Sequence, residues 1–313
     1  MSAPLEPSTP VAITVRGLTK HYGRVRAVQG LSFEVPWGTV TGFLGPNGAG
    51  KTTTIRILLG LVRPTAGSTQ VAGQPFDRLA APATVVGALL DASSVHPGRT
   101  GRSHLRILAT HIGIDDHRVD QLLDLVELGD AADRRARGYS MGMRQRLGLA
   151  AALLGEPRVL ILDEPANGLD PAGINWLRGF LRDFAARGGA AFVSSHLLAE
   201  MAQLADDVVV IDRGRLVVEG PVRELVSRSA GKVHARTPAP DRLREALAQR
   251  GIHSDAAGGE AVVVLEATPE AVGAIAAEQG IVLYGLDAER ESLEDVFLSL
   301  TGGPRNGRKG ARR

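Results

Sequence analysis

The segment Gly45-Pro46-Asn47-Gly48-Ala49-Gly50-Lys51-Thr52 matches the pattern G-x-x-x-x-G-K-[ST]. An apolar run, Val40–Leu44, precedes it, and a stretch with apolar residues at helical spacing, including Ile55 and Leu58, follows it. These patterns predict a strand, a tight glycine-rich turn and a helix. The chain order strand, turn, helix is the context in which this glycine pattern binds phosphate groups.

This turn, called the phosphate cradle below (Gly45–Thr52), is a candidate nucleotide site. Consecutive backbone N–H groups of a glycine-rich turn point to one place, and the N-terminus of the following helix adds partial positive charge there. The cradle is therefore expected to hold the β- and γ-phosphates, with a full charge from Lys51 and a Mg²⁺ ligand from the Thr52 hydroxyl. Thr53 is included among the binding residues. The alternative is a glycine turn that packs and binds nothing.

Composition narrows the function classes. None of the 313 residues is cysteine, which excludes disulfides, thiol catalysis and cysteine-based metal sites. No stretch approaches 18 uninterrupted apolar residues, so no membrane-spanning segment is predicted. Residues 1–10 are polar and proline-rich, lack the features of a secretory signal, and are predicted to be disordered.

The net charge of +2 comes from the C-terminal tail, residues 302–313, which holds five basic residues and no acidic one. Without those five, 31 basic residues face 34 acidic ones, so the folded part is slightly acidic. The tail is predicted to be a solvated, disordered end, with contact to anionic lipid as the alternative. No nucleic-acid partner is expected.

The coarse pattern predicts an α/β protein with a mixed sheet. Hairpin-like strands are expected within 11–44, a short strand pair within 67–76, and a helical subdomain at about 98–157. Fully apolar runs predict buried parallel strands, at 85–90, 159–162 and 190–195. Asp115 or Asp116 is expected to cap one helix, and Asp170, followed by a proline, another.

The pattern changes after residue 228. Residues 229–301 predict a small α+β accessory domain with alternating strands and helices. The strands are expected near 232–235, 261–266 and 281–284, and the helices near 240–249, 269–279 and 292–300. A regulatory or dimer-stabilising role is preferred for this domain over an independent binding module.

Asp163 and Glu164 stand at the end of the apolar run Val159–Leu162. Because the carboxyl ends of parallel strands meet at one edge of a sheet, this acid pair is expected beside the phosphate cradle. One of these two carboxylates can hold Mg²⁺ through water, and the other can orient and deprotonate the attacking water.

Six motifs follow one another in an order that resembles the ATP-binding subunits of ABC transporters, over residues 11–228. They are the Tyr22 segment, the Gly45–Thr52 cradle, the signature-like Ser140-Met141-Gly142-Met143, the acid pair after Val159, the segment Gly168-Leu169-Asp170, and His196. The resemblance implies that Tyr22 stacks on adenine and that Ser140, Gly142 and Asp170 belong to the nucleotide site. It also implies that Asp163 holds Mg²⁺, that Glu164 polarises the attacking water, and that His196 contacts the γ-phosphate. The alternatives are a packing role for Tyr22 and a structural role for His196.

Two departures from the family pattern matter. Met141 and Met143 replace a glycine and a glutamine of the signature, although Ser140 and Gly142 remain. Asp91 stands where the family usually has a glutamine, and it is a candidate for contact with Mg²⁺ or water, or else a solvated strand end. These departures and the accessory domain resemble the drug and peptide-antibiotic exporter branch, in which a single-cassette subunit pairs with a separate permease.

The resemblance therefore implies a P-loop cassette that binds ATP and Mg²⁺, hydrolyses ATP, and powers an integral membrane permease by head-to-tail dimerisation, with a homodimer expected. It would lie at the cytoplasmic face of the membrane, held there by the permease, and export a drug, antibiotic or peptide. Two alternatives stay open: a soluble ABC-type ATPase that acts on ribosomes or nucleic acid, and a nucleotide-binding scaffold without turnover.

Overall fold

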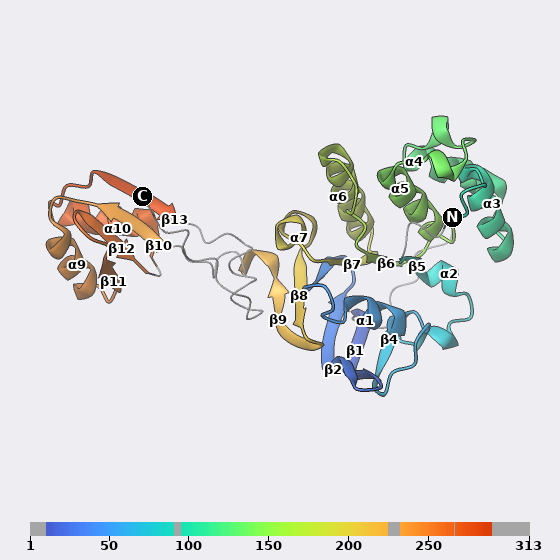
Figure 1. Ribbon diagram of the computed structural model, residues 1–313, viewed down its shortest axis with the longest axis horizontal. Coiled ribbons are helices and arrows are strands. Elements are labelled where there is room, and N and C mark those ends of the chain that lie inside the picture. The colour runs from blue at the N-terminus through green and yellow to red at the C-terminus, as the bar shows by residue number, and fades with distance from the viewer. Residues whose placement is uncertain (1–10, 91–94, 225–231, 266, 290–313) are drawn as a thin grey trace. The chain divides into compact units, whose positions relative to one another are not determined.

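A computed structural model describes residues 11–90, 95–224, 232–265 and 267–289 (Figure 1). The chain divides into two compact units, Met1–Val222 and Arg223–Arg313, and each has a hydrophobic core of its own. The domain boundaries predicted above stay predictions.

The first unit is built around a six-stranded sheet, as counted over the described residues, with the order β5-β6-β7-β3-β8-β9. The strands are β3 (Val40–Leu44), β5 (Val86–Leu89), β6 (Val159–Asp163), β7 (Ala190–Ser195), β8 (Asp207–Asp212) and β9 (Arg215–Pro221). All neighbours are parallel except β8 and β9. Every residue of β3, β6 and β7 is buried, which explains their mostly apolar sequence.

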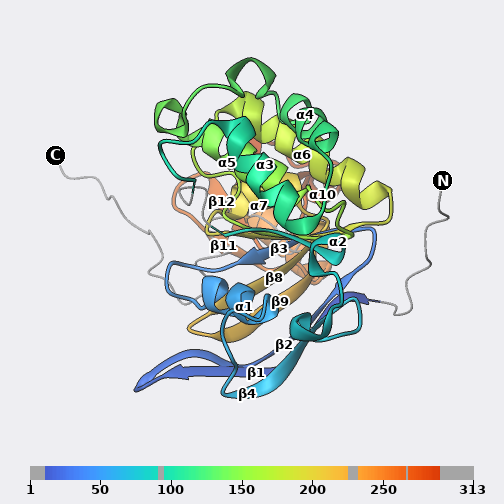
Figure 2. The ribbon, with the colours of Figure 1, turned by 90° about the vertical axis from the view of Figure 1, so that its right-hand side faces the viewer.

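A second, antiparallel sheet has the order β2-β1-β4, formed by β1 (Val11–Tyr22), β2 (Val25–Pro36) and β4 (Ala66–Val71). Helix α1 (Lys51–Leu58) lies between the two sheets (Figure 2). Its Ile55 and Leu58 join a core that contains three mutually packed rings, Phe33, Phe43 and Phe192, with centroids 4.9–5.5 Å apart. This packing fixes the helix that follows the phosphate cradle.

Helices cover the other face of the parallel sheet (Figure 2). They are α3 (Gly101–Ile112), α4 (Asp116–Leu125), α5 (Met141–Ala152), α6 (Pro171–Ala186) and α7 (Leu198–Leu204). Short helical turns occupy α2 (Pro82–Val85) and residues 76–78, 129–131 and 136–138. The predicted caps are confirmed: Asp115 accepts a hydrogen bond from the His117 N–H at α4, and Asp170 accepts one from the Gly173 N–H at α6.

Thr100 caps α3 by accepting a hydrogen bond from the Ser103 N–H at 3.1 Å. Thr100→Ala leaves that N–H without its partner, so we expect the free energy of unfolding to fall by about 1 kcal/mol. Urea denaturation measures the change. Thr110→Ala, which removes an exposed hydroxyl bonded only within the same helix to the Arg106 carbonyl, is the matched control. Equal losses in the two variants would contradict the capping role.

The second unit, where described, has the order β10 (Lys232–Arg236), α9 (Pro240–Gln249), β11 (Ser254–Ala256), β12 (Ala261–Val264), α10 (Pro269–Glu278), β13 (Gly285–Glu289). The strands form an antiparallel sheet in the order β11-β12-β10-β13, the arrangement of a split β-α-β fold. Its own core gathers Leu243, Leu247, Val272 and Ile275 from the helices against Val262 of the sheet. The α+β prediction is confirmed.

Two local predictions need correction. The strand pair expected within 67–76 is reduced to one antiparallel bridge between Val71 and Gln74 across a sharp turn at Ala72 and Gly73, whose φ angles are positive, and β4 pairs with β1 instead. The strand expected at 281–284 is also wrong: Ile281 packs into the core, Val282 and Tyr284 are exposed, and pairing begins only at Gly285. Strand β11 was not predicted. The helix expected at 292–300 lies outside the described residues.

Candidate active site

The phosphate cradle connects the carboxyl end of β3 to the first turn of α1, as predicted. Two glycines are required by close approach: a Cβ at Gly45 would lie 2.5 Å from the Ile211 carbonyl oxygen, and one at Gly50 would overlap the Ala27 carbonyl oxygen. Gly48 and Gly50 also have φ angles of 81° and 107°, which favour glycine. Pro46, Asn47 and Ala49 complete the loop, and the first turn of α1 carries no acidic residue to offset its positive end.

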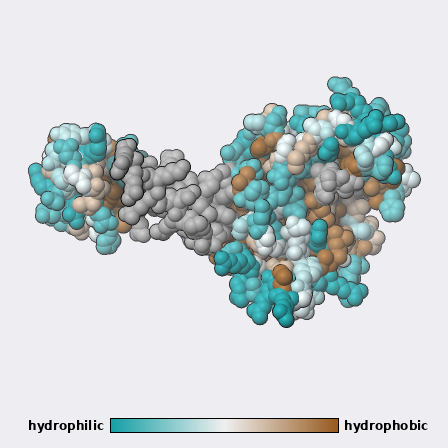
Figure 3. Space-filling view, viewed as in Figure 1, coloured by the Kyte–Doolittle hydropathy of each residue, from teal (hydrophilic) through white to brown (hydrophobic). Residues whose placement is uncertain are grey.

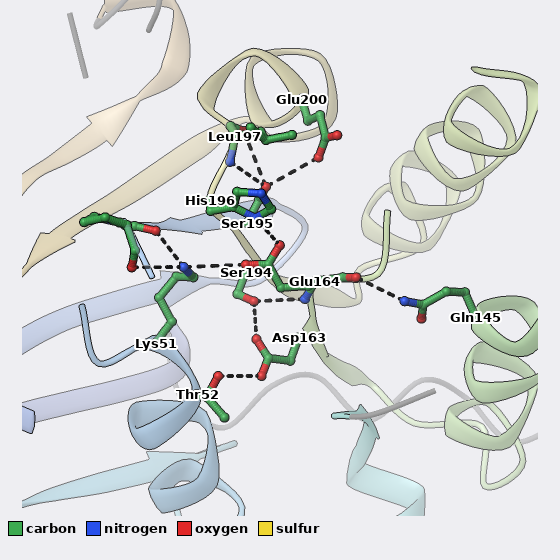
Figure 4. A network of polar contacts seen from close by, with 12 residues as sticks. Lys51, Thr52, Gln145, Asp163, Glu164, Ser194, Ser195, His196, Leu197 and Glu200 are labelled. Carbon is green, nitrogen blue, oxygen red and sulfur yellow. Dashed lines mark hydrogen bonds and ion pairs between the residues drawn. The ribbon is translucent and has the colours of Figure 1, made fainter. Parts of the chain in front are cut away.

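Lys51 lies within the cradle with its side chain buried. Its Nζ donates a hydrogen bond to the Gly45 carbonyl at 2.6 Å and lies 3.5 Å from both the Pro46 carbonyl oxygen and the Glu164 Oε1. The ammonium group is therefore the one cation that links the cradle to the acid pair in the described network of Figure 4.

Thr52 and Asp163 form the oxygen-rich side of the site. The Thr52 hydroxyl donates to Asp163 Oδ2 at 2.9 Å, and Ser194 Oγ, one strand away, donates to Asp163 Oδ1 at 2.5 Å. Hydroxyl and carboxylate oxygens are ligands that Mg²⁺ prefers, and one or two of them suffice when phosphates supply the others. Over the described residues, no group of three or more His, Asp or Glu side chains is arranged so that it could hold a metal ion.

Glu164 follows the end of β6 in a left-handed backbone conformation, with φ at 51°. For a residue with a Cβ this geometry costs about 1–3 kcal/mol, and it concentrates at functional sites. The side chain lies between two partners, since Oε1 is 3.5 Å from Lys51 Nζ and Oε2 is 2.8 Å from His196 Nδ1 (Figure 4). The structure thus brings together Lys51, Glu164 and His196, which the sequence places far apart.

Sequence reasoning missed two neighbours of the acid pair, Ser194 and Gln145. Ser194 accepts a hydrogen bond from the Glu164 N–H at 3.0 Å, and Gln145 Nε2 donates one to the Glu164 carbonyl at 3.3 Å. A signal for Ser194 exists in its position, a hydroxyl at the end of the apolar run Ala190–Val193. Gln145 offers a weaker signal, a polar residue on a largely apolar helix.

The signature-like segment begins helix α5. Ser140 is the N-cap and its hydroxyl accepts a hydrogen bond from the Met143 N–H, while Met141 packs against Gly168 and Gly142 lies close to the Gly168 carbonyl. Burial raises the pKa of the preceding Tyr139 phenol above its usual value, and its hydroxyl donates to the Ala131 carbonyl. The segments around Ser140 and Asp170 therefore pack together within one chain.

Three predicted site residues lie apart from the network in the part of the chain that the structure describes. Tyr22 is half-exposed at the tip of the β1–β2 hairpin, with Lys20 Nζ 4.8 Å from its ring centre. Ser140 and Asp170 act as helix caps and make no hydrogen bond to Lys51 or the acid pair. Asp91 lies outside the described residues. Their roles at a nucleotide stay predictions.

A parallel sheet with a phosphate cradle and an acid pair at the ends of its strands defines a P-loop nucleotide-binding cassette. The chain is 36% identical over 298 residues to the bacitracin transport ATP-binding protein BcrA of Bacillus licheniformis, covering 93% of this chain and 97% of that protein. It is also 36% identical over 326 residues to the daunorubicin resistance ATP-binding protein DrrA3 of Streptomyces coeruleorubidus, covering 96% and 99%. The chain belongs to the ABC transporter ATP-binding proteins.

The family described as "ABC transporter" matches residues 28–167, and a domain of unknown function matches residues 229–294. The dimeric structure of MJ0796, a bacterial ABC transporter cassette, superposes with a TM-score of 0.62 at 20% identity, covering 67% of this chain and 99% of that one, which supports the fold. The predicted family, fold class and ATPase activity are thereby confirmed. Of the helices in the described residues, none has the length and apolarity needed to cross a bilayer.

Proposed function

We propose that this chain is the ATP-hydrolysing subunit of an export system and drives a separate membrane permease. The observation that carries the proposal is the polar network in which Lys51, Thr52, Asp163, Glu164 and His196 meet at one edge of the parallel sheet. Relatives named for bacitracin transport and daunorubicin resistance support a drug or peptide-antibiotic substrate. The chain would then lie at the cytoplasmic face of the membrane, held by the permease.

The proposed roles follow from position. The cradle N–H groups and Lys51 bind the β- and γ-phosphates, because they supply the positive charge at the first turn of α1. Glu164 accepts the proton of the attacking water, and His196 orients the Glu164 carboxylate from 2.8 Å and contacts the γ-phosphate. Thr52 and Asp163 would hold Mg²⁺, which neutralises charge developing on the phosphates.

Asp163→Asn tests the magnesium assignment. The substitution keeps the size of the side chain but removes its charge, so we expect the Mg²⁺ concentration for half-maximal ATP hydrolysis to rise about 10- to 100-fold. A Mg²⁺ titration of phosphate release measures it. Asp207→Asn, at the opposite end of neighbouring strand β8 from the cradle, is the matched control. An unchanged Mg²⁺ requirement in Asp163→Asn would rule out Asp163 as a metal-holding residue.

We further propose that two copies associate head to tail, with each ATP between the cradle of one copy and the Ser140 segment of the other. In support, Ser140 is exposed at the positive end of α5, where it caps the helix and leaves N–H groups available to a phosphate, and the similar cassette MJ0796 was solved as a dimer. The ATP-bound dimer would then drive conformational change in the permease. ATP-dependent association of the purified chain, followed by light scattering, tests the arrangement.

A membrane partner is supported by the surface of the first unit. Figure 3 shows apolar patches set among hydrophilic surface, and the apolar side chains Ile107, Ile112 and Leu125 of the helical segment are exposed. Contiguous exposed apolar patches mark sites where proteins bind partners. Solubilising membranes and identifying the integral protein that co-purifies with the chain tests the proposal; recovery of ribosomes or nucleic acid instead would contradict it.

A further inference from the structure

The peptide backbone of Glu164 is held on both sides by side chains from other elements (Figure 4). Its N–H donates to Ser194 Oγ on β7 at 3.0 Å, and its carbonyl accepts from Gln145 Nε2 on α5 at 3.3 Å. With φ at 51°, Glu164 has a left-handed backbone conformation. L-residues rarely adopt this conformation unless the surrounding structure holds them in it. The two contacts are therefore placed where backbone restraint is needed.

Ser194 directs one donated and one accepted hydrogen bond to the acid pair. A hydroxyl has one proton to donate and lone pairs to accept. Here the proton goes to Asp163 Oδ1 and the oxygen accepts the Glu164 N–H, while the side chain is fully buried. Ser194 lies directly opposite Asp163 in the pairing of β6 with β7. One side chain thus sets the position of both acids and leaves Asp163 Oδ2 to Thr52.

Gln145 is a buried amide in apolar surroundings. It borders a cavity of about 10 Å³ together with Leu89, Pro165 and Leu177, and its Oε1 has no hydrogen-bond partner among the described protein atoms. An apolar side chain of the same length would fit such a place without the cost of burying an amide. Within the described residues, the amide makes one hydrogen bond, to the Glu164 carbonyl, and we assign the presence of a buried glutamine to that bond.

We propose that Ser194 and Gln145 are positioning residues that together fix the backbone of Glu164, so that its carboxylate stays against Lys51 and His196. The inference rests on the catalytic role proposed above for Glu164. Because Gln145 belongs to α5, whose first turn is capped by Ser140, it also ties the orientation of this helix to the acid pair. A shift of α5 against the sheet would then change the placement of Glu164.

Gln145→Met and Ser194→Ala test the proposal in the full-length chain. In Gln145→Met we expect kcat for ATP hydrolysis to fall at least about tenfold, with KM for ATP within about twofold and Tm unchanged or raised, since an apolar side chain replaces a buried amide. Ser194→Ala is expected to show the same split between kcat and KM, with some loss of Tm. A purely structural role would lower Tm and leave the kcat of the folded protein intact.

Thr41→Val is the control for Ser194→Ala, because it removes a buried hydroxyl from neighbouring strand β3 without touching the acid pair. Each variant is also combined with Glu164→Gln, where a residue acting through Glu164 should reduce the remaining rate by less than twofold. If Ser194→Ala does not fold, the kcat and KM of Gln145→Met alone test the inference.

The inference is overturned when Gln145→Met keeps kcat within twofold of the parent, or lowers the residual rate of Glu164→Gln tenfold again. These outcomes leave the proposed function standing as long as Glu164→Gln itself abolishes turnover. Should Glu164→Gln hydrolyse ATP at the parent rate, the proposed catalytic role fails first, and the inference with it.

Discussion

Glu164→Gln is expected to reduce steady-state ATP hydrolysis by 10²- to 10⁴-fold, about 3–5 kcal/mol of activation free energy. The amide preserves the size of the side chain and can still contact His196 and Lys51, but it cannot accept a proton from water. Binding of ATP should persist, since the cradle and Lys51 are untouched. Phosphate release and nucleotide binding, measured on the same preparation, separate the two effects.

The control is Glu219→Gln, which makes the same chemical change at an exposed position on β9. It should hydrolyse ATP at the parent rate. Light scattering adds a second readout, because the Glu164→Gln protein should accumulate as an ATP-bound dimer when turnover is blocked. A variant that turns over ATP normally would show that another group accepts the proton.

Lys51→Ala is expected to weaken ATP binding by about 2–5 kcal/mol, or from about 30-fold to several thousand-fold. The ammonium group is buried, and it is the cation that joins the cradle to Glu164, so truncation removes charge at the place where phosphates would lie. A fluorescent ATP analogue, competed with ATP, measures the affinity. Lys51→Arg should also bind weakly, since a planar guanidinium does not reproduce a compact ammonium group.

Arg56→Ala, which removes an exposed cation from the same helix, is the matched control for Lys51→Ala and should bind ATP within twofold of the parent. Thermal unfolding of both variants checks that α1 is intact. If Lys51→Ala bound ATP as tightly as Arg56→Ala, the cradle would have to hold phosphate through its backbone alone.

Much of the site could be predicted because its residues follow the ends of buried strands. Apolar runs mark β3, β6 and β7, and the residues after them, from Gly45, Asp163 and His196 onward, must then meet at one edge of the sheet. Hydrophobic periodicity and motif spacing are local patterns, so they are enough to predict where each strand ends and which residues follow it. The helix caps at Asp115 and Asp170 could be predicted because a cap depends on the residues directly before and inside the first helical turn.

The rest depends on contacts between distant elements. Ser194 reaches Asp163 only through the register of β7 on β6, and Gln145 reaches Glu164 only through the rotation of α5 about its axis, neither of which a local pattern specifies. The wrong strand at 281–284 has a related cause. Four successive apolar residues predict a strand, but strand pairing begins only at Gly285, and the residues before it pack Ile281 and Leu283 against the core with Val282 and Tyr284 exposed.

Gly45 packs closely against the Ile211 carbonyl, and Gly50 packs closely against the Ala27 carbonyl. The neighbouring strands β8 and β2 therefore determine the conformation of the phosphate cradle. Its shape is therefore acquired when the protein folds. When a ligand binds to a preorganised loop, the loop loses little conformational entropy, so more of the interaction energy appears as affinity. Substitutions at these two glycines would consequently impair folding and ligand binding together.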